Sequence, residues 1–227
     1  ENVGALREDA CPLGVFTSFA PLDLSVCSLI GDVPSELIQM KADRFDILLS
    51  DNIGLVLRAA NIAEQVTEMD LSCCSLCGDI SDDLFARLAR LDRFDISGNP
   101  MLNQDTLLGH LVCQYSNLTN ARQLEVNFRG VSGPISSAIS ACASLTKLHL
   151  VSNKLTGELP LTLIRMKARG CDVALAGNYG LTLPPNIDEL GDDILELDLS
   201  CCSLIGTVPE AIGKLVRLTY LGLDDNK

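Results

Sequence analysis

Cysteine has the widest chemical repertoire of the residue types in this chain, and ten cysteines occur among its 227 residues. Two groups of them are close in sequence: Cys73, Cys74 and Cys77, and Cys201 with Cys202. Grouped thiols bind zinc or form disulfides. A structural zinc site needs four convergent ligands, however, and the two histidines, His110 and His149, lie on different segments. We therefore predict neither a metal site nor a cofactor.

Enzyme motifs are missing from the sequence. It contains no nucleophile elbow, no phosphate-binding loop and no HExxH helix. A histidine-based triad would have to use His110 or His149. Because His149 is the middle residue of an L-x-L pattern, we expect it to face solvent and to serve as a contact residue. The sequence therefore predicts no catalytic activity.

Acidic residues dominate the charge of the chain. Thirty Asp and Glu against 17 Lys and Arg give a formal net charge of −13 at pH 7. Nucleic acid and anionic membrane surfaces attract basic patches, so we expect neither as a partner. The sequence has no run of about 18 apolar residues, which argues against direct membrane insertion. It also shows no signal peptide at its start.

The elements that position these residues follow from the repeated L-x-L pattern. Side chains alternate along a strand, so two apolar residues around a polar one predict a short strand with one buried face. The second apolar position of the pattern recurs at Leu24, Leu49, Leu71, Ile96, Val126, Leu150, Leu175, Leu199 and Leu223. The steps between these register positions are 25, 22, 25, 30, 24, 25, 24 and 24 residues. This period predicts nine stacked coils, with every register residue buried.

A small polar or thiol residue follows each strand at a fixed distance. Three residues after the register positions stand Cys27, Asn52, Cys74, Asn99, Arg129, Asn153, Asn178, Cys202 and Asn226. The sharp turn there needs an inward polar group, which Asn supplies with its amide and Cys with a weak S–H donor. Arg129 is the exception, and we expect an irregular turn around it. We call the other eight residues the turn ladder.

These features resemble the leucine-rich repeat. One full coil lies within Leu197–Asn226, and its segment Leu204–Pro209, L-x-G-x-V-P, is similar to the plant-type subtype of about 24 residues per repeat. The resemblance implies an α/β solenoid, a right-handed horseshoe or arc with a concave parallel β-sheet and short helices or 3₁₀ turns on the convex side. Apolar spacing predicts helices within 35–45 and 81–94, with Ser81 at the start of the second.

The chain divides into two parts by regularity. Residues 1–21 are expected to form a degenerate first coil or an N-terminal cap, and residues 22–227 the repeat domain. The 30-residue step predicts an insertion near 100–120, with a helix over 105–115. Both ends look like cuts in a longer protein, because the chain begins at Glu1 and stops directly after a strand.

The coil spacing decides how the cysteines are used. Cys27, Cys74 and Cys202 lie on coils that have at least one other coil between them, which separates them by about 10 Å. A disulfide tolerates only about 4.4–6.8 Å between Cα atoms. We therefore expect three free thiols at buried turn positions, and we place Cys142 in the core because it falls on an apolar series.

The compartment is left open between two readings. Cysteines within the core favour a reducing, intracellular or organellar compartment. The triplet Asn117-Leu118-Thr119 is a possible glycosylation site at Asn117, and the resemblance to the plant-type subtype implies secreted or cell-surface relatives. An extracellular location is therefore the alternative.

Acidic residues gather at the exposed positions of the predicted strands. Ten such positions are acidic, and with His149 they form our candidate binding surface: Asp23, Asp46, Glu68, Asp70, Asp95, Glu125, Asp172, Glu196, Asp198 and Asp224. Only Arg93 and Lys147 are basic there, whereas most Lys and Arg, including Lys41 and Lys167, fall on the convex segments. The simpler interpretation is that LDLS is a common consensus of the family, and that charged sheets resist edge aggregation. The functional one is a surface selective for a basic partner.

The sequence is thus read as a non-catalytic protein-protein interaction module, a scaffold or subunit of a larger assembly that binds a basic protein through its acidic concave sheet. One alternative is an extracellular receptor ectodomain that recognises a peptide or another ligand. Another is the recognition arm of a multidomain kinase or ubiquitin ligase. The oligomeric state is not predicted.

Overall fold

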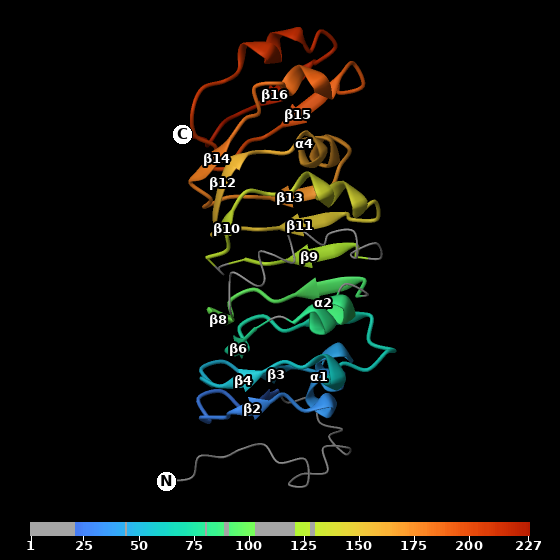
Figure 1. Cartoon of the computed structure of the whole chain (residues 1–227), viewed down its shortest axis with the longest axis vertical. Coiled ribbons are helices and arrows are strands. Elements are labelled where there is room, and N and C mark those ends of the chain that lie inside the picture. The colour runs from blue at the N-terminus through green and yellow to red at the C-terminus, as the bar shows by residue number, and fades with distance from the viewer. Residues whose placement is uncertain (1–20, 44, 80, 89–90, 103–120, 128–129) are drawn as a thin grey trace.

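The chain forms a solenoid whose coils stack along one axis, with β2 (Gly31–Asp32) near one end and the C-terminus near the other (Figure 1). A computed structural model describes residues 21–43, 45–79, 81–88, 91–102, 121–127 and 130–227. Most of the predicted cap, the predicted helix over 105–115, Asn117 and Arg129 lie outside these ranges.

The nine predicted strands are all present. They are β1 (Leu22–Asp23), β3 (Ile47–Leu48), β5 (Glu68–Asp70), β7 (Arg93–Asp95), β9 (Gln123–Glu125), β11 (Lys147–His149), β13 (Asp172–Ala174), β15 (Glu196–Asp198) and β16 (Tyr220–Gly222). Every pairing among them is parallel, and each pair joins successive coils in equivalent register. This series is the concave sheet of the repeat architecture.

A second series of short strands was not predicted. Four of them pair in the order β2 (Gly31–Asp32), β4 (Leu55–Val56), β6 (Leu76–Gly78) and β8 (Met101–Leu102). Three more pair in the order β10 (Ser132–Gly133), β12 (Lys154–Glu158) and β14 (Gly180–Thr182). They lie across the solenoid from the helices (Figure 1). An L-x-G segment marks this series in several coils, as Leu76–Gly78 does in β6.

The other side of the solenoid carries the helices. These are α1 (Ser35–Ala42), α2 (Asp82–Leu88), α4 (Leu161–Ala168) and the 3₁₀ turns η2 (Ala59–Asn61), η4 (Ser137–Ala141), η5 (Ile187–Leu190) and η6 (Glu210–Lys214). Helices α1 and α2 lie within the two predicted helical segments. Before α2, the Ser81 hydroxyl accepts a hydrogen bond from the Leu84 N–H at 3.2 Å, as an N-cap residue does.

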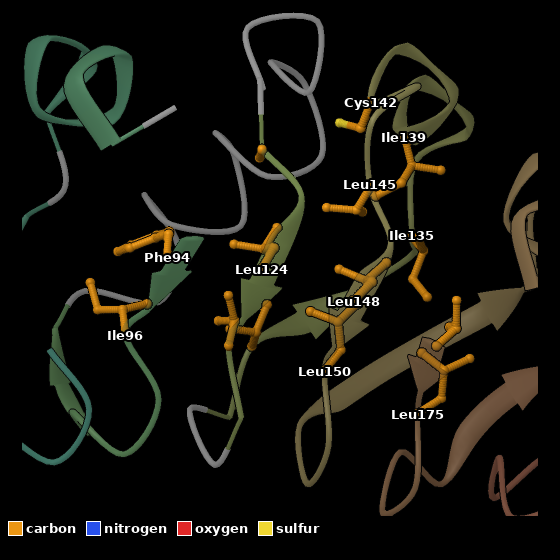
Figure 2. Close-up of a cluster of buried hydrophobic side chains, with 14 of the residues drawn as sticks. Phe94, Ile96, Leu124, Ile135, Ile139, Cys142, Leu145, Leu148, Leu150 and Leu175 are labelled. Carbon is orange, nitrogen blue, oxygen red and sulfur yellow. The ribbon is translucent and has the colours of Figure 1, made fainter. Parts of the chain in front are cut away.

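The core is a continuous column of apolar side chains from successive coils, part of which Figure 2 shows. Seven of the nine register residues are buried. Leu24 and Leu223 are only half-buried and contradict the prediction. Leu223 belongs to the last coil, which has a neighbour on one side only. Cys142 points into the column beside Ile139 and Leu145 and is buried, as predicted (Figure 2).

The asparagines of the turn ladder join each coil to the one before it. The Asn99 amide donates to its own coil at Ile96 O (2.9 Å) and to the preceding coil at Leu71 O (2.8 Å). Its Oδ1 accepts from the N–H groups of Cys74 and Leu76, both at 3.0 Å. Asn52 makes the same four bonds, and both residues are fully buried. One side chain therefore satisfies four buried backbone groups.

The cysteines of the turn ladder satisfy fewer backbone groups with their side chains than Asn52 and Asn99 do. The thiol of Cys74 donates within its own coil, to Ser72 O at 3.3 Å, and Cys27 does the same with Ser25 O. Cys74 and Cys202 are buried, but Cys27 is exposed, which corrects the prediction. A ladder residue is covered by coils on both sides, whereas Cys27 has a described coil on one side only.

Candidate binding site on the concave sheet

The predicted contact residues all lie on the outer surface of the concave strands or directly beside it. Six are exposed: Asp23, Asp46, Asp172, Glu196, Asp198 and Asp224. Five are half-buried: Glu68, Asp70, Asp95, Glu125 and His149. The strand register aligns Asp70, Asp95, Glu125 and His149 in one row across four neighbouring strands. Neighbours in this row are separated by about 5 Å.

Several of the acids have a structural task. The carboxylates of Asp23, Asp70, Asp95 and Asp198 each accept the N–H of the serine two residues later, at 2.8–2.9 Å. These bonds close the turn after the strand. They also hold the pKa of the Asp23 and Asp198 carboxyls below their usual value. The recurring D-x-S pattern is thus explained by turn formation at these positions.

Cations compensate the acids in the middle of the sheet. Lys147 Nζ lies 2.6 Å from Glu125 Oε1. The His149 ring bridges two strands, with Nε2 2.9 Å from Asp172 Oδ2 and Nδ1 3.6 Å from Glu125 Oε2. His149 is therefore a partner of acidic residues, in addition to being accessible from solvent.

Toward the N-terminal coils, fewer cations balance the negative charges of this row of carboxylates. Asp95 stands between Asp70 and Glu125 and forms no ion pair with a described residue. Its pKa is raised, chiefly because the carboxyl is partly buried, and further by the charges of Asp70 and Glu125, while the bonds from Ser97 oppose the shift. The three neighbouring carboxylates therefore repel each other in the folded state.

The concave sheet is interrupted twice. Strands β1 and β3 form one sheet, β5 to β13 a second, and β15 and β16 a third. Within the described residues, no backbone hydrogen bond joins β3 to β5 or β13 to β15. We call these gaps the first and the second break.

A lysine from a preceding helix enters each break. Leu22 and Leu24 donate to Asp46 O and Leu48 O, so the alternating carbonyl of Ile47 faces the next coil. Lys41 Nζ, from α1, donates to Ile47 O at 3.0 Å. Lys167 Nζ, from α4, donates to Val173 O at 3.1 Å in the same way. Both lysines belong to helices of the convex segments, as expected, and their ammonium groups bond to strand carbonyls.

The two breaks are equivalent in sequence as well. Residues 35–57 align without a gap with 161–183, and 68–78 align with 196–206, sharing L-I-x-M-K-A and L-S-C-C-S-L. The alignment and the strand register give six pairs of equivalent positions, one member at each break. They are Lys41 and Lys167, Asp46 and Asp172, Glu68 and Glu196, Asp70 and Asp198, Asp23 and His149, and Arg93 and Tyr220. Sequence reasoning missed this duplication, although both motifs were there to find it.

A pocket of about 290 Å³ opens at the first break. It is lined by Lys41, Ala42, Phe45, Asp46, Ile47, Glu68, Met69, Asp70 and Arg93. Three of the predicted contact residues meet there, and sequence reasoning had not included Lys41, Phe45 or Arg93 in the site. The pocket combines three carboxylates with two cations and one partly exposed aromatic ring.

The cysteines of the described residues are all free thiols, including Cys27, Cys74 and Cys202. Burial raises the pKa of the Cys74 and Cys142 thiols to about 11, so both are protonated at neutral pH. No group of three or more His, Cys, Asp or Glu in the described ranges is placed to hold a metal ion. Among the helices that the structure describes, none is long and apolar enough to cross a membrane.

Comparisons with known proteins agree with this architecture. The leucine-rich-repeat family model matches residues 144–166 and 193–215. The ectodomain of the Arabidopsis receptor kinase HAESA, solved with the peptide hormone IDA and the co-receptor SERK1, is similar with a TM-score of 0.52 and 23% identity over 94% of this chain and 35% of that one. A second HAESA structure, with an N-terminally extended IDA peptide, has a TM-score of 0.52 and 19% identity over 88% of this chain and 36% of that one. A leucine-rich-repeat protein of Leptospira interrogans has a TM-score of 0.49 and 23% identity over 88% of this chain and 47% of that one.

These likenesses concern the fold. The chain spans about a third of the length of the two HAESA structures. A comparison with curated protein sequences gave no match. The stacked coils and the asparagine ladder have the architecture of the leucine-rich repeat, and the family model matches two segments of the chain.

Proposed function

We propose that the chain is a non-catalytic protein-binding module that takes a basic polypeptide segment across its concave sheet. The observation that carries this proposal is the row of Asp70, Asp95 and Glu125 on adjacent strands. Burial and mutual repulsion raise the pKa of Asp95 in this row. A cationic segment laid across the strands relieves that repulsion and gains attraction at several points.

The affinity of such a contact comes from the number of pairs. An exposed ion pair contributes about 0.2–1 kcal/mol, and salt screens it. A surface of one charge also accelerates the encounter with an oppositely charged partner. The described cations on the concave strands are Arg93 and Lys147, and Lys147 is already bound to Glu125. The surface therefore favours basic partners over acidic ones.

A second candidate keeps the surface and changes the partner. In the HAESA structures the partner is a peptide hormone, and those ectodomains share this fold. We infer that an extracellular peptide with basic residues is a suitable alternative to a basic protein within an assembly. Both candidates need the same row of carboxylates.

A fluorescent oligo-lysine peptide tests the location of binding. We expect the concave triple variant Asp70→Asn, Asp95→Asn and Glu125→Gln to bind it at least about threefold more weakly than wild type at low salt. The matched control is the convex triple variant Asp83→Asn, Asp192→Asn and Glu210→Gln, which removes the same charge. We expect the control to change affinity by less than about twofold. Equal weakening by both variants would show that only net charge matters.

A further inference from the structure

The pocket at the first break has the size and position to hold one side chain of a bound segment. Its volume is about 290 Å³, roughly twice that of a cavity that accommodates benzene. It is lined by residues of β5 and β7, the strands that begin the acidic row. A segment lying on that row therefore passes over the mouth of the pocket.

The acids of this pocket differ in how far they are engaged. Asp70 is bound to the N–H and the hydroxyl of Ser72, at 2.9 and 2.6 Å. Asp46 is exposed, and its carboxylate makes no hydrogen bond or ion pair with a described residue. Lys41, one of the two cations in the lining, is engaged with the carbonyl of Ile47. Asp46, next to Glu68 in the lining, is thus the carboxylate best placed to receive a new cation.

Arg93 indicates what a ligand of this pocket needs besides a positive charge. Its Nε is buried and has no hydrogen-bond acceptor among the described residues, although the residue lines the pocket. Leaving a buried donor without an acceptor is unfavourable. A ligand that binds here should therefore bring an acceptor together with its positive charge. A metal cation or a polyamine brings no acceptor, whereas a peptide offers a backbone carbonyl at every residue.

We propose that the pocket at the first break is the anchoring subsite for one arginine of the bound segment. Its guanidinium group pairs with the carboxylate of Asp46, because a planar fork of donors suits a carboxylate, and Glu68 adds negative charge to the same lining. A carbonyl of the same segment accepts the Arg93 Nε–H once this partly exposed side chain turns toward the pocket. The subsite rests on the proposed function and assigns its ligand class, an arginine-containing peptide.

The second break supplies a built-in control. Asp172 occupies the position of Asp46, but its carboxylate is bound to His149. Tyr220 occupies the position of Arg93. The same substitution at the two equivalent aspartates therefore changes the net charge equally, but only at the first break does it remove a carboxylate that has no partner among the described residues.

Binding of a labelled oligo-arginine peptide to Asp46→Asn and Asp172→Asn separates the subsite from general electrostatics. We expect about a threefold to fivefold loss of affinity for Asp46→Asn and less than about twofold for Asp172→Asn. Equal losses overturn the subsite and leave the concave proposal standing. If the wild type does not bind oligo-arginine at low salt, both proposals fail.

The variant Arg93→Met tests the acceptor requirement by the sign of its effect. Removing a cation from an acidic surface should tighten the binding of a basic peptide if only charge matters. The subsite predicts the opposite, a weakening of about twofold or more, because the buried donor to the peptide carbonyl is lost. Binding of spermine, which has no carbonyl, should become tighter in the same variant. Tighter binding of oligo-arginine to Arg93→Met overturns the subsite, and unchanged thermal unfolding verifies that the variant is folded.

Discussion

The two breaks of the concave sheet share a backbone design and differ in the surface that it supports. In both, a lysine from a helix bonds to a strand carbonyl, and three equivalent acids flank the gap. At the first break Arg93 stands in the next strand and Asp23 in the preceding coil, whereas Tyr220 and His149 hold these positions at the second. His149 then binds Asp172 at 2.9 Å.

This difference teaches that acidic residues on such a sheet have to be sorted by their partners. Some carboxylates close turns, as Asp198 does with Ser200. Others are compensated by a neighbouring strand, as Glu125 is by Lys147. A carboxylate for which the described residues show neither task, such as Asp46, is the most available to a ligand. The two breaks show that one or two neighbouring side chains determine which of these roles a carboxylate has.

The largest expected effect tests whether the two breaks are equivalent in structure. Lys41→Met and Lys167→Met should each lower the free energy of unfolding by about 1–3 kcal/mol, because each leaves a carbonyl inside the gap without its donor. The two losses should be similar if the breaks are built alike. Urea unfolding followed by circular dichroism measures them.

The control for the lysines is Lys214→Met. Lys214 is a largely exposed residue of η6 that pairs with Asp188 at 3.0 Å, so its loss should cost less than about 1 kcal/mol. A loss at Lys41 or Lys167 no greater than this would contradict the structural role of the inserted ammonium groups.

A smaller effect concerns the residue that follows the first break in the acidic row. Asp95 there is matched by Gly222 after the second break. The Asp95 pKa is raised in the fold, so between its ordinary value of 3.8 and the raised value the native state holds more protons than the unfolded state. Stability is therefore lost as pH rises through this window. Asp95→Asn, which keeps an acceptor for the Ser97 N–H, should raise the free energy of unfolding at pH 7 by about 0.2–1 kcal/mol.

The pH dependence checks the cause of that gain. The advantage of Asp95→Asn over wild type should disappear below pH 3.8, where the wild-type carboxyl is protonated in both states. Unfolding curves of both proteins at neutral and acidic pH measure it. A gain that stays constant with pH would point to packing as its cause.

The smallest effect converts the second break toward the first. His149→Asp places an acid where coil one has Asp23 and frees the carboxylate of Asp172. Affinity for oligo-arginine should rise by about twofold, within the range of one exposed ion pair. His149→Asn serves as the control, because it removes the ring without adding charge. Equal affinities of the two variants would show that the added charge has no local effect.

The residue pattern predicted the coils because L-x-L fixes which face of each strand is buried, and because Asn99 and its equivalents bond to the backbone of two neighbouring coils. It did not predict the breaks, since the bond from Lys41 to Ile47 O depends on how α1 sits between coils. The shared motif L-I-x-M-K-A was a usable signal for them. The exposure of Cys27 was missed because a ladder residue is buried by its neighbouring coils and not by its own.

The most direct test of the central claim is to locate a bound basic peptide on the protein. An oligo-lysine peptide that carries a nitroxide label broadens the amide resonances of nearby residues in an NMR spectrum. The account predicts broadening at 68–70, 93–95 and 123–125, at low salt and not at high salt. Broadening centred on α2, η5 or η6 would contradict it, because the peptide would then bind the convex side.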